Sequence, residues 1–347
     1  MNKGHERKKN LLSIIDTLQR CGALTQSQLK DHCGLQASTV SYLIKDLEAC
    51  GFIRDLGRTS NNGKAGKPGS MIALNNDKAS FLGIYAEDNS LDAHLVGIDE
   101  ATLEEQHVKF GDLQIEEAIS SLILRALEQH PQIKGVGIAI KAIVHHDGSI
   151  RSARRQDSRG GEGFWNFAGM RDKLRQAFPS ILIAVENDAN CAAMLHLHQT
   201  GRRMDNLIVC LINENPFGIG CGLIVKGQLF RGSTGAAGEF FDPDSRLRAL
   251  AETLTGKEDF LDRFVPAILP ALTDALYLMD PEMLVLTGSM FDGLEEDQMR
   301  CIQQAFRASP VSIRVKGGPE QLNPANGAAL LVTNDYIAGF IEEVKKR

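Results

Sequence analysis

The sequence predicts an α/β protein in which a small helical domain precedes a larger two-lobed body. Residues 1–80 contain three closely spaced helical patterns, whereas from Phe81 onward apolar runs alternate with helical segments and glycines are frequent. That alternation is typical of layered α/β folds, and 347 residues are enough for two such lobes. The expected boundaries are 1–77 for the N-terminal domain, 78–187 together with 325–347 for the first lobe, and 188–324 for the second.

Charge is distributed unevenly along the chain. The net charge is −6, but the first 80 residues hold 12 Lys and Arg against 7 Asp and Glu, and the remaining 267 hold 26 against 37. The N-terminal domain therefore favours a polyanionic partner and the body does not.

Other compositional features indicate a soluble protein of the cytoplasm. The apolar segment near the N-terminus is interrupted by polar residues at helical spacing, which predicts neither a signal peptide nor a membrane span. We expect no membrane partner. The seven cysteines are scattered singly, a pattern that predicts reduced thiols and no metal site.

The first two helical patterns are followed by clear cap signals. One helix is expected from about Arg7 to Arg20, with apolar residues on one face. Thr25 then stands three residues before Gln28, the spacing of a capping box, and Gly34 is expected to end that second helix.

The third helix is the candidate recognition helix of a helix-turn-helix. Ser38 is expected to cap its N-terminus, and its outer face presents short polar groups, an aromatic ring and a cation. Side chains of this kind can reach base edges in a major groove, while a helix N-terminus faces phosphate. The alternative is a structural three-helix bundle with a polar outer face. The candidate DNA-binding residues on this helix are Ser38, Thr39, Ser41, Tyr42 and Lys45.

A hairpin with a long basic loop follows the third helix. Residues 51–54 and 71–74 are predicted to be paired strands, and the region between them includes Arg58, Lys64 and Lys67. We interpret it as a wing whose cations contact phosphates or a minor groove. A flexible linker would explain the glycines there, but neither the flanking strands nor the charge.

The stretch VENDANCAAM, residues 185–194, places a carboxylate where a buried strand turns into a helix. An enzyme could use Asp188 there as a base toward a sugar hydroxyl. Without a phosphoryl donor, Asp188 and Asn187 would instead hydrogen-bond a ligand. The alternative is that they only cap the next helix.

The order of these motifs resembles the ROK family of repressors, open reading frames and sugar kinases. The resemblance covers nearly the whole chain and implies an actin-like ATPase fold with a winged helix-turn-helix in front of it. It also implies a DNA-binding transcription regulator, a repressor whose effector is a sugar or sugar derivative bound between the lobes. The matching segments are 66–68 in the wing and 82–84, 135–139, 165–170, 186–190, 218–222, 235–239, 280–282 and 287–289 in the body.

Departures from the kinase pattern imply that the chain is not an enzyme. Where family kinases end the first strand in Asp and a glycine-rich phosphate turn, this chain has Tyr85 followed by the acids Glu87 and Asp88. The second phosphate turn reads Pro-Phe-Gly at 216–218. Acidic groups repel a triphosphate, and tyrosine cannot ligate magnesium as aspartate does. The alternative is a sugar kinase with a divergent phosphate clamp and an accessory DNA-binding head.

The effector loop also departs from the family. Glu239 is kept as a hydroxyl acceptor, but the expected zinc-binding His and Cys are missing, so we expect neither metal nor cofactor. Lys141 takes the place of a turn that shapes the sugar pocket and favours an anionic effector, unless it only pairs with a neighbouring carboxylate. A further alternative is a body that has lost its ligand and serves in dimerisation.

The partners expected from these observations are double-stranded operator DNA, a small effector and a second copy of the chain. A homodimer or tetramer would place two recognition helices on a roughly palindromic operator.

Overall fold

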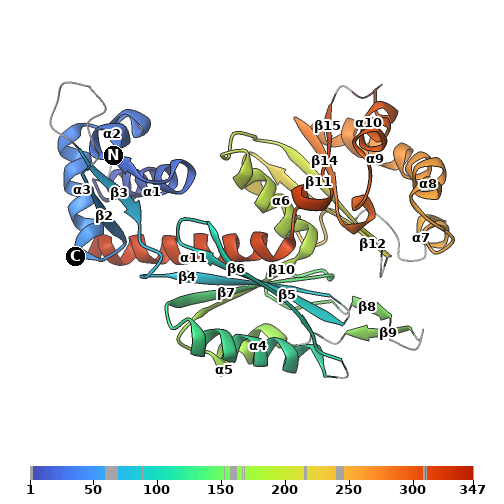
Figure 1. Ribbon diagram of the computed structural model, residues 1–347, viewed down its shortest axis with the longest axis horizontal. Coiled ribbons are helices and arrows are strands. Elements are labelled where there is room, and N and C mark those ends of the chain that lie inside the picture. The colour runs from blue at the N-terminus through green and yellow to red at the C-terminus, as the bar shows by residue number, and fades with distance from the viewer. Residues whose placement is uncertain are drawn as a thin grey trace.

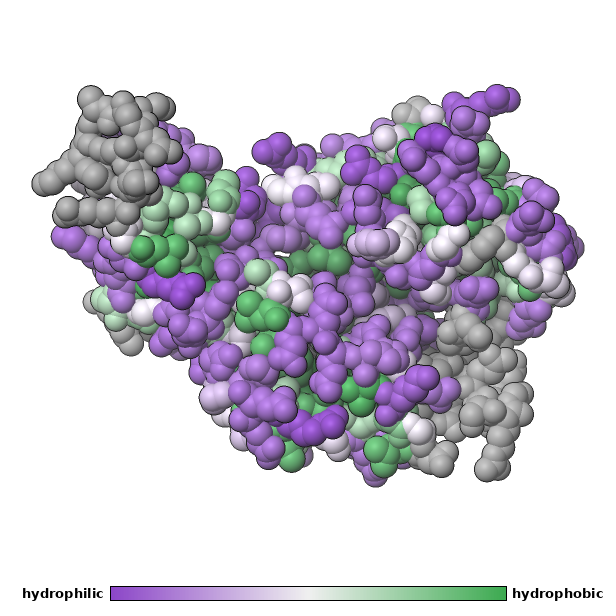
Figure 2. All heavy atoms as spheres, viewed as in Figure 1, coloured by the Kyte–Doolittle hydropathy of each residue, from purple (hydrophilic) through white to green (hydrophobic). Residues whose placement is uncertain are grey.

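The computed structural model describes residues 3–58, 69–87, 89–111, 113–151, 153–156, 162–165, 167, 169–214, 217–239, 246–307, 309 and 311–346. Within these residues the predicted α/β class is confirmed, with a small head at one end and a body of two sheet-containing lobes (Figure 1). In the view of Figure 2 hydrophobic residues form small separated patches on a mostly hydrophilic surface.

The head is a helix-turn-helix backed by a small sheet. Thr25 and Gln28 form the predicted capping box, and Gly34 ends the second helix at φ 64°. The hairpin of β2 and β3 is antiparallel as predicted, and the short β1 adds to the other edge of β3. The elements are α1 (Lys3–Cys21), β1 (Leu24–Thr25), α2 (Gln26–Cys33), α3 (Ala37–Ala49), β2 (Ile53–Arg58) and β3 (Ser70–Leu74).

The predicted cap of the third helix is wrong. Helix α3 begins at Ala37, and Gln36 is its N-cap residue, with extended backbone and no side-chain cap hydrogen bond. Because the chain is already helical at Ala37, Ser38 lies in the first turn and cannot serve as the cap.

The first lobe is a five-stranded sheet with helices on both faces. Its strand order is β10-β7-β4-β5-β6, in which β4, β5 and β6 are antiparallel and β7 and β10 run parallel to β4. Helices α4 and α5 cover one face and α11 covers the other (Figure 1). The elements are β4 (Ser80–Ala86), β5 (Ser90–Gly97), β6 (Thr102–Lys109), α4 (Ile115–Gln129), β7 (Ile133–Ile140), β8 (Ala153–Gln156), β9 (Glu162–Trp165), α5 (Met170–Ala177), β10 (Leu182–Asn187) and α11 (Pro324–Lys346).

The second lobe repeats this topology. Its order, β13-β12-β11-β14-β15, again joins an antiparallel meander to two strands that run parallel to its first strand. Leu207 and Val209 of β11 face α6, whereas Ile208 and Cys210 face α9, which explains the unbroken apolar run. The elements are α6 (Asp188–Gln199), β11 (Leu207–Glu214), β12 (Phe217–Val225), β13 (Gln228–Leu229), α7 (Arg246–Ala251), α8 (Lys257–Asp259), the π-helix η1 (Phe260–Phe264), α9 (Val265–Met279), β14 (Met283–Thr287), the 3-10 helix η2 (Ser289–Phe291), α10 (Glu296–Ala305), β15 (Ser312–Val315) and the 3-10 helix η3 (Gly318–Glu320).

Helix α11 packs very closely on the first sheet because of two glycines. A Cβ atom at Gly83 would lie 1.9 Å from the carbonyl oxygen of Ala325, and one at Gly137 would lie 1.9 Å from that of Ala328. Any side chain there would push the helix off the sheet. These motif glycines therefore serve helix packing.

The same helix joins the head to the first lobe. The rings of Phe52 in the head and Phe340 in α11 are stacked with centroids 4.1 Å apart, and Phe81 of β4 lies 5.4 Å from the Tyr336 ring. The apolar core of the head is continuous with residues of this lobe and of α11. The head and the first lobe thus share one core.

Candidate functional site

The outer face of α3 presents the predicted residues to solvent. Ser38, Tyr42 and Lys45 are exposed, while Thr39 and Ser41 are partly buried. The opposite stripe of the helix is buried against the head core. This exposed face of α3 can therefore lie in the major groove of DNA.

Tyr42 is held from the side by α1. The guanidinium of Arg7 lies 5.8 Å from the centre of the Tyr42 ring and also pairs with Asp46 at 2.9 Å. The ring itself remains 57% exposed. An exposed aromatic ring whose position is fixed in this way is suited to contact with bases or with a thymine methyl group.

The wing is described only at its base. Arg58 is the last residue of β2, and its backbone is paired with Ser70 of β3. Lys64 and Lys67 lie outside the described residues, as does the 66–68 motif.

Asn187 and Asp188 lie at the turn from β10 into α6, as predicted. Asn187 is the N-cap: its Oδ1 accepts from the Asn190 backbone N–H at 3.1 Å, and its Nδ2 donates to the Ala142 carbonyl at 3.3 Å. The Asp188 Oδ1 accepts from the Ala189 backbone N–H at 2.9 Å. Both side chains are buried and hydrogen-bonded within the protein.

Tyr85 of β4 connects Asp188 to Asn213 of β11. Its hydroxyl donates to the Asp188 Oδ2 at 3.4 Å and accepts from the Asn213 Nδ2 at 3.1 Å. The Asn213 Oδ1 in turn accepts from the Ser289 backbone N–H. A chain of hydrogen bonds therefore runs from the start of α6, through Tyr85 of β4, to β11 and η2.

Two carboxyl groups near this bridge have raised pKa values. Burial raises the pKa of Asp188 to about 6, although the positive charge of Lys141 acts against the shift. For Glu239, the loss of water around the carboxyl group and the nearby negative charge of Asp188 raise the pKa to about 7, and the positive charge of Arg151 acts against this shift. Glu239 nevertheless stays exposed to solvent, so protons can reach it.

Lys141 is unusual because its side-chain ammonium group is buried without a hydrogen-bond acceptor among the described residues. Its Nζ lies 5.8 Å from the centre of the Tyr85 ring. A buried ammonium without an acceptor is costly, so this group is suited to an anionic partner.

Glu186 is held by one residue of its own motif and by one distant residue that no sequence pattern predicts. Its carboxylate accepts from Arg231 Nε at 2.6 Å and from Asn190 Nδ2 at 2.9 Å. Arg231 is 45 residues away in the sequence and carries no local motif, as is also true of Asn213. Only the packing of the second lobe against β10 brings them to this site.

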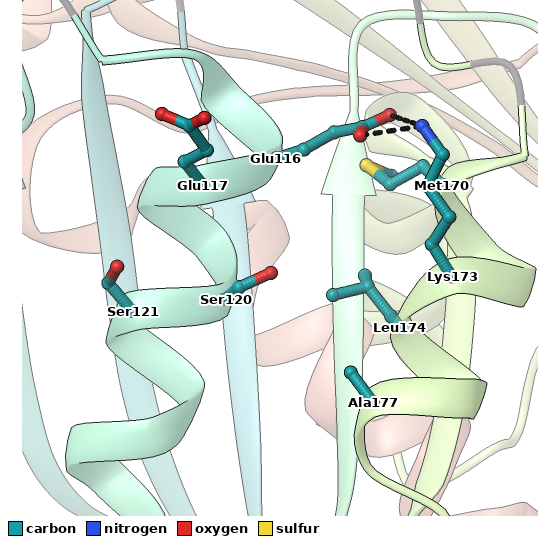
Figure 3. Close-up of a pocket in the computed structure, with 8 residues that line it drawn as sticks. All are labelled: Glu116, Glu117, Ser120, Ser121, Met170, Lys173, Leu174 and Ala177. Atoms are coloured by element: carbon teal, nitrogen blue, oxygen red, sulfur yellow. Dashed lines mark hydrogen bonds and ion pairs between the residues drawn. The ribbon is translucent and has the colours of Figure 1, made fainter.

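A groove of about 400 Å³ lies elsewhere, between α4 and α5 on the outer face of the first lobe. Figure 3 shows Lys173 reaching across it to Glu116, with Nζ 2.9 Å from Oε2. None of the residues that line it belongs to the candidate site.

Two features are absent from the described residues, a metal-binding cluster and a membrane-spanning helix. These residues contain no group of three His, Cys, Asp or Glu side chains placed to hold a metal ion. No helix among them combines the length and the hydropathy needed to cross a membrane.

Comparison with protein families matches two parts of the chain. Residues 82–240 match the ROK family, and residues 7–54 match a winged helix-turn-helix DNA-binding family.

Among curated proteins the chain is similar to several xylose repressors. It is 21% identical over 241 residues to that of Bacillus subtilis, covering 67% of this chain and 59% of the repressor. It is 24% identical over 244 residues to that of Caldicellulosiruptor bescii, covering 66% and 57%. The match thus spans about three fifths of the length of these relatives.

Among solved structures the chain is similar in fold to regulators and kinases. A ROK family transcriptional regulator, a homologue of the E. coli MLC protein, superposes with a TM-score of 0.68 at 14% identity, covering 98% of this chain and 99% of the regulator. The ROK hexokinase of Thermus thermophilus superposes with a TM-score of 0.56 at 18% identity, covering 74% of this chain and 99% of the hexokinase.

Proposed function

We propose that this chain, which joins a winged helix-turn-helix head to a ROK family domain, is a DNA-binding transcriptional repressor. The observation that carries the proposal is the outer face of α3, where Tyr42 and Lys45 stand exposed on a helix whose other side is buried. The net positive charge of the head favours the same partner. A homodimer or tetramer in the cytoplasm, with two heads on one operator, completes the proposal.

We also propose that the chain does not phosphorylate sugars. The Tyr85 ring is buried where family kinases keep an aspartate, and its hydroxyl is occupied by Asp188 and Asn213. Phe217, at the second phosphate turn, packs edge-on against Phe264, with centroids 5.5 Å apart. Both positions are filled by aromatic rings, which neither ligate magnesium nor donate to phosphate. A coupled assay of ATP hydrolysis with a sugar panel is expected to give no turnover, and sugar-dependent turnover would favour the kinase alternative.

The proposed effector is a small polar molecule, a sugar or sugar derivative, bound near Asp188, Glu239, Lys141 and Asn187. Support for an anionic effector, such as a sugar phosphate or sugar acid, comes from the buried Lys141 Nζ. Asn187 and Asp188 already have partners within the protein, and the contact of Asp188 with Tyr85 joins the two lobes. Use of Asp188 by a ligand therefore requires a shift of the lobes. Such a shift would change the placement of the heads, which is how a ligand can alter DNA affinity.

The decisive experiment is binding of the purified protein to its own upstream intergenic DNA, measured by fluorescence anisotropy across a salt series. Saturable binding that resists unrelated competitor DNA is expected. Equal displacement by unrelated DNA would contradict a sequence-reading repressor.

Effector binding is tested separately by calorimetric titration. Neutral sugars, sugar phosphates and sugar acids are compared on the wild type and on Lys141→Gln. The expected result is heat from an anionic member of the panel, lost in the variant. Absence of heat from every compound would favour a body that serves only in dimerisation.

A further inference from the structure

A group of charged and polar residues lies where the head meets both lobes. At its centre is Glu100, in the turn between β5 and β6, whose side chain is only 2% exposed. The end of α6 approaches it from the second lobe, with His198 Nε2 2.8 Å and Arg202 Nη2 4.0 Å from its carboxylate oxygens. We call Asp16, Glu100, His198, Arg202 and Asn334 the Glu100 node.

Arg202 connects this node to the head. Its Nη1 lies 3.7 Å from the Asp16 Oδ1 in α1, and its Nη2 donates to the Asn334 Oδ1 in α11 at 3.1 Å. Asp16 is further held by Arg20 at 2.9 Å. One guanidinium thus contacts the head, the turn of the first lobe and the long helix that supports both.

The backbone conformation at the node is unusual. Glu100 has a φ of 67° and Arg202 a φ of 55°, in the left-handed region that residues other than glycine rarely adopt. Strain of this kind persists where the surrounding contacts compensate for it, and it is common at switch points. Two such residues facing each other indicate that their contact is maintained by the fold.

The packing of the apolar cores shows which parts of the molecule move together and which motion would change the contacts of Arg202. The head shares a core with the first lobe and α11, so these parts move together. His198 lies in the last turn of α6 and Arg202 just beyond it. Helix α6 packs on β11 and β12 of the second lobe and also on α11. A rotation of the second lobe that moves the end of α6 relative to α11 would therefore make or break the contacts of Arg202 with Glu100 and Asp16.

We propose that Arg202 is a positioning residue for DNA binding. It holds the winged-helix head in place through Asp16 and Glu100, so that a change in the arrangement of the lobes changes the position of the head. This inference rests on the proposed repressor function. It assigns the coupling between body and head to a specific contact, which lies away from the candidate effector residues. A small change of lobe closure would reach the head through it.

The test is a double-mutant cycle with Arg202→Gln and Asp16→Asn in the full chain, using affinity for the upstream intergenic DNA. If the node positions the head, each variant binds more weakly, on the order of three- to tenfold, and the double variant binds no more weakly than either one. If the two groups acted only through direct charge on DNA, Asp16→Asn would bind more tightly and the two effects would add. That outcome would overturn the proposal.

Matched controls separate the node from general charge effects. Arg203→Gln removes an exposed arginine next to Arg202, and Asp31→Asn removes an exposed acid of the head. Both are expected to change affinity less than twofold, as is Arg202→Lys, which keeps the charge. Losses as large as that of Arg202→Gln in both controls would reject a specific role for Arg202.

Urea unfolding of the same variants keeps this inference distinct from the proposed function. If the wild type fails to bind its upstream DNA, the repressor proposal fails first. The unfolding data then test the node without any DNA. Coupling between the changes in the free energy of unfolding at positions 16 and 202 supports the contact of Arg202 with the head, and additive changes reject it.

Discussion

The hydroxyl of Tyr85 lies 3.1 Å from the amide nitrogen of Asn213, although 128 residues separate them in the sequence. This hydrogen bond joins β4 of the first lobe to β11 of the second. Because the same hydroxyl also contacts Asp188, it connects the candidate effector site to the relative position of the lobes.

Removing that hydroxyl is expected to weaken the fold modestly. Tyr85→Phe deletes the bridge and leaves the amide of Asn213 without one of its partners, at a cost of about 1–3 kcal/mol in the free energy of unfolding. Urea denaturation measures it. Tyr277→Phe, at an exposed position, is the control and is expected to change the free energy by less than about 0.5 kcal/mol. Equal values for the two variants would argue against the bridge.

Asp188 is expected to make stability fall as the pH rises. Its pKa is raised to about 6 in the fold from an ordinary value of 3.8, so the folded protein binds the proton more tightly. The stabilisation is complete below about pH 4 and is lost as the pH rises through about 6. Asp188→Asn should therefore be more stable than the wild type at pH 7.5, by up to about 3 kcal/mol, and should lose that advantage near pH 4. A constant difference across this range would contradict the raised pKa.

Tyr42 and Lys67 are expected to affect DNA binding differently. Tyr42→Ala should relax the preference among operator variants, because its exposed ring lies on the recognition face. Lys67→Ala should weaken binding to all sequences similarly and reduce the salt slope by about one, as a phosphate contact does. Competition titrations at several salt concentrations separate the two effects. Identical behaviour would mean that the recognition helix or the wing is misassigned.

Two glycine substitutions should have opposite effects on stability. Gly137→Ala places a Cβ 1.9 Å from a carbonyl oxygen of α11, which is expected to cost more than about 2 kcal/mol or to prevent folding. Gly339→Ala, on an open face of the same helix, has nothing within 4 Å and should stabilise by about 0.5–1 kcal/mol through helix propensity. Thermal unfolding of both proteins gives the comparison.

Hydrophobic periodicity was sufficient for most of the elements. Strands β7 and β11 are mostly apolar because both faces of their sheets are covered, so they stand out among the apolar runs after Phe81. Strand β6 lies at the edge of its sheet with nearly every residue exposed, so no apolar run marks it. The capping box of Thr25 was predicted because it depends on residues three apart.

Local sequence patterns are enough to predict the α/β class, the helix-turn-helix head and the turn that carries Asn187 and Asp188. These depend on local spacing, on burial patterns and on short-range hydrogen bonds, which neighbouring residues specify. The packing of the lobes was needed to see that Tyr85 bridges Asp188 to Asn213, and that Arg202 joins Asp16 to Glu100. Such contacts depend on how separately formed lobes pack, and no local pattern records which distant side chains will meet.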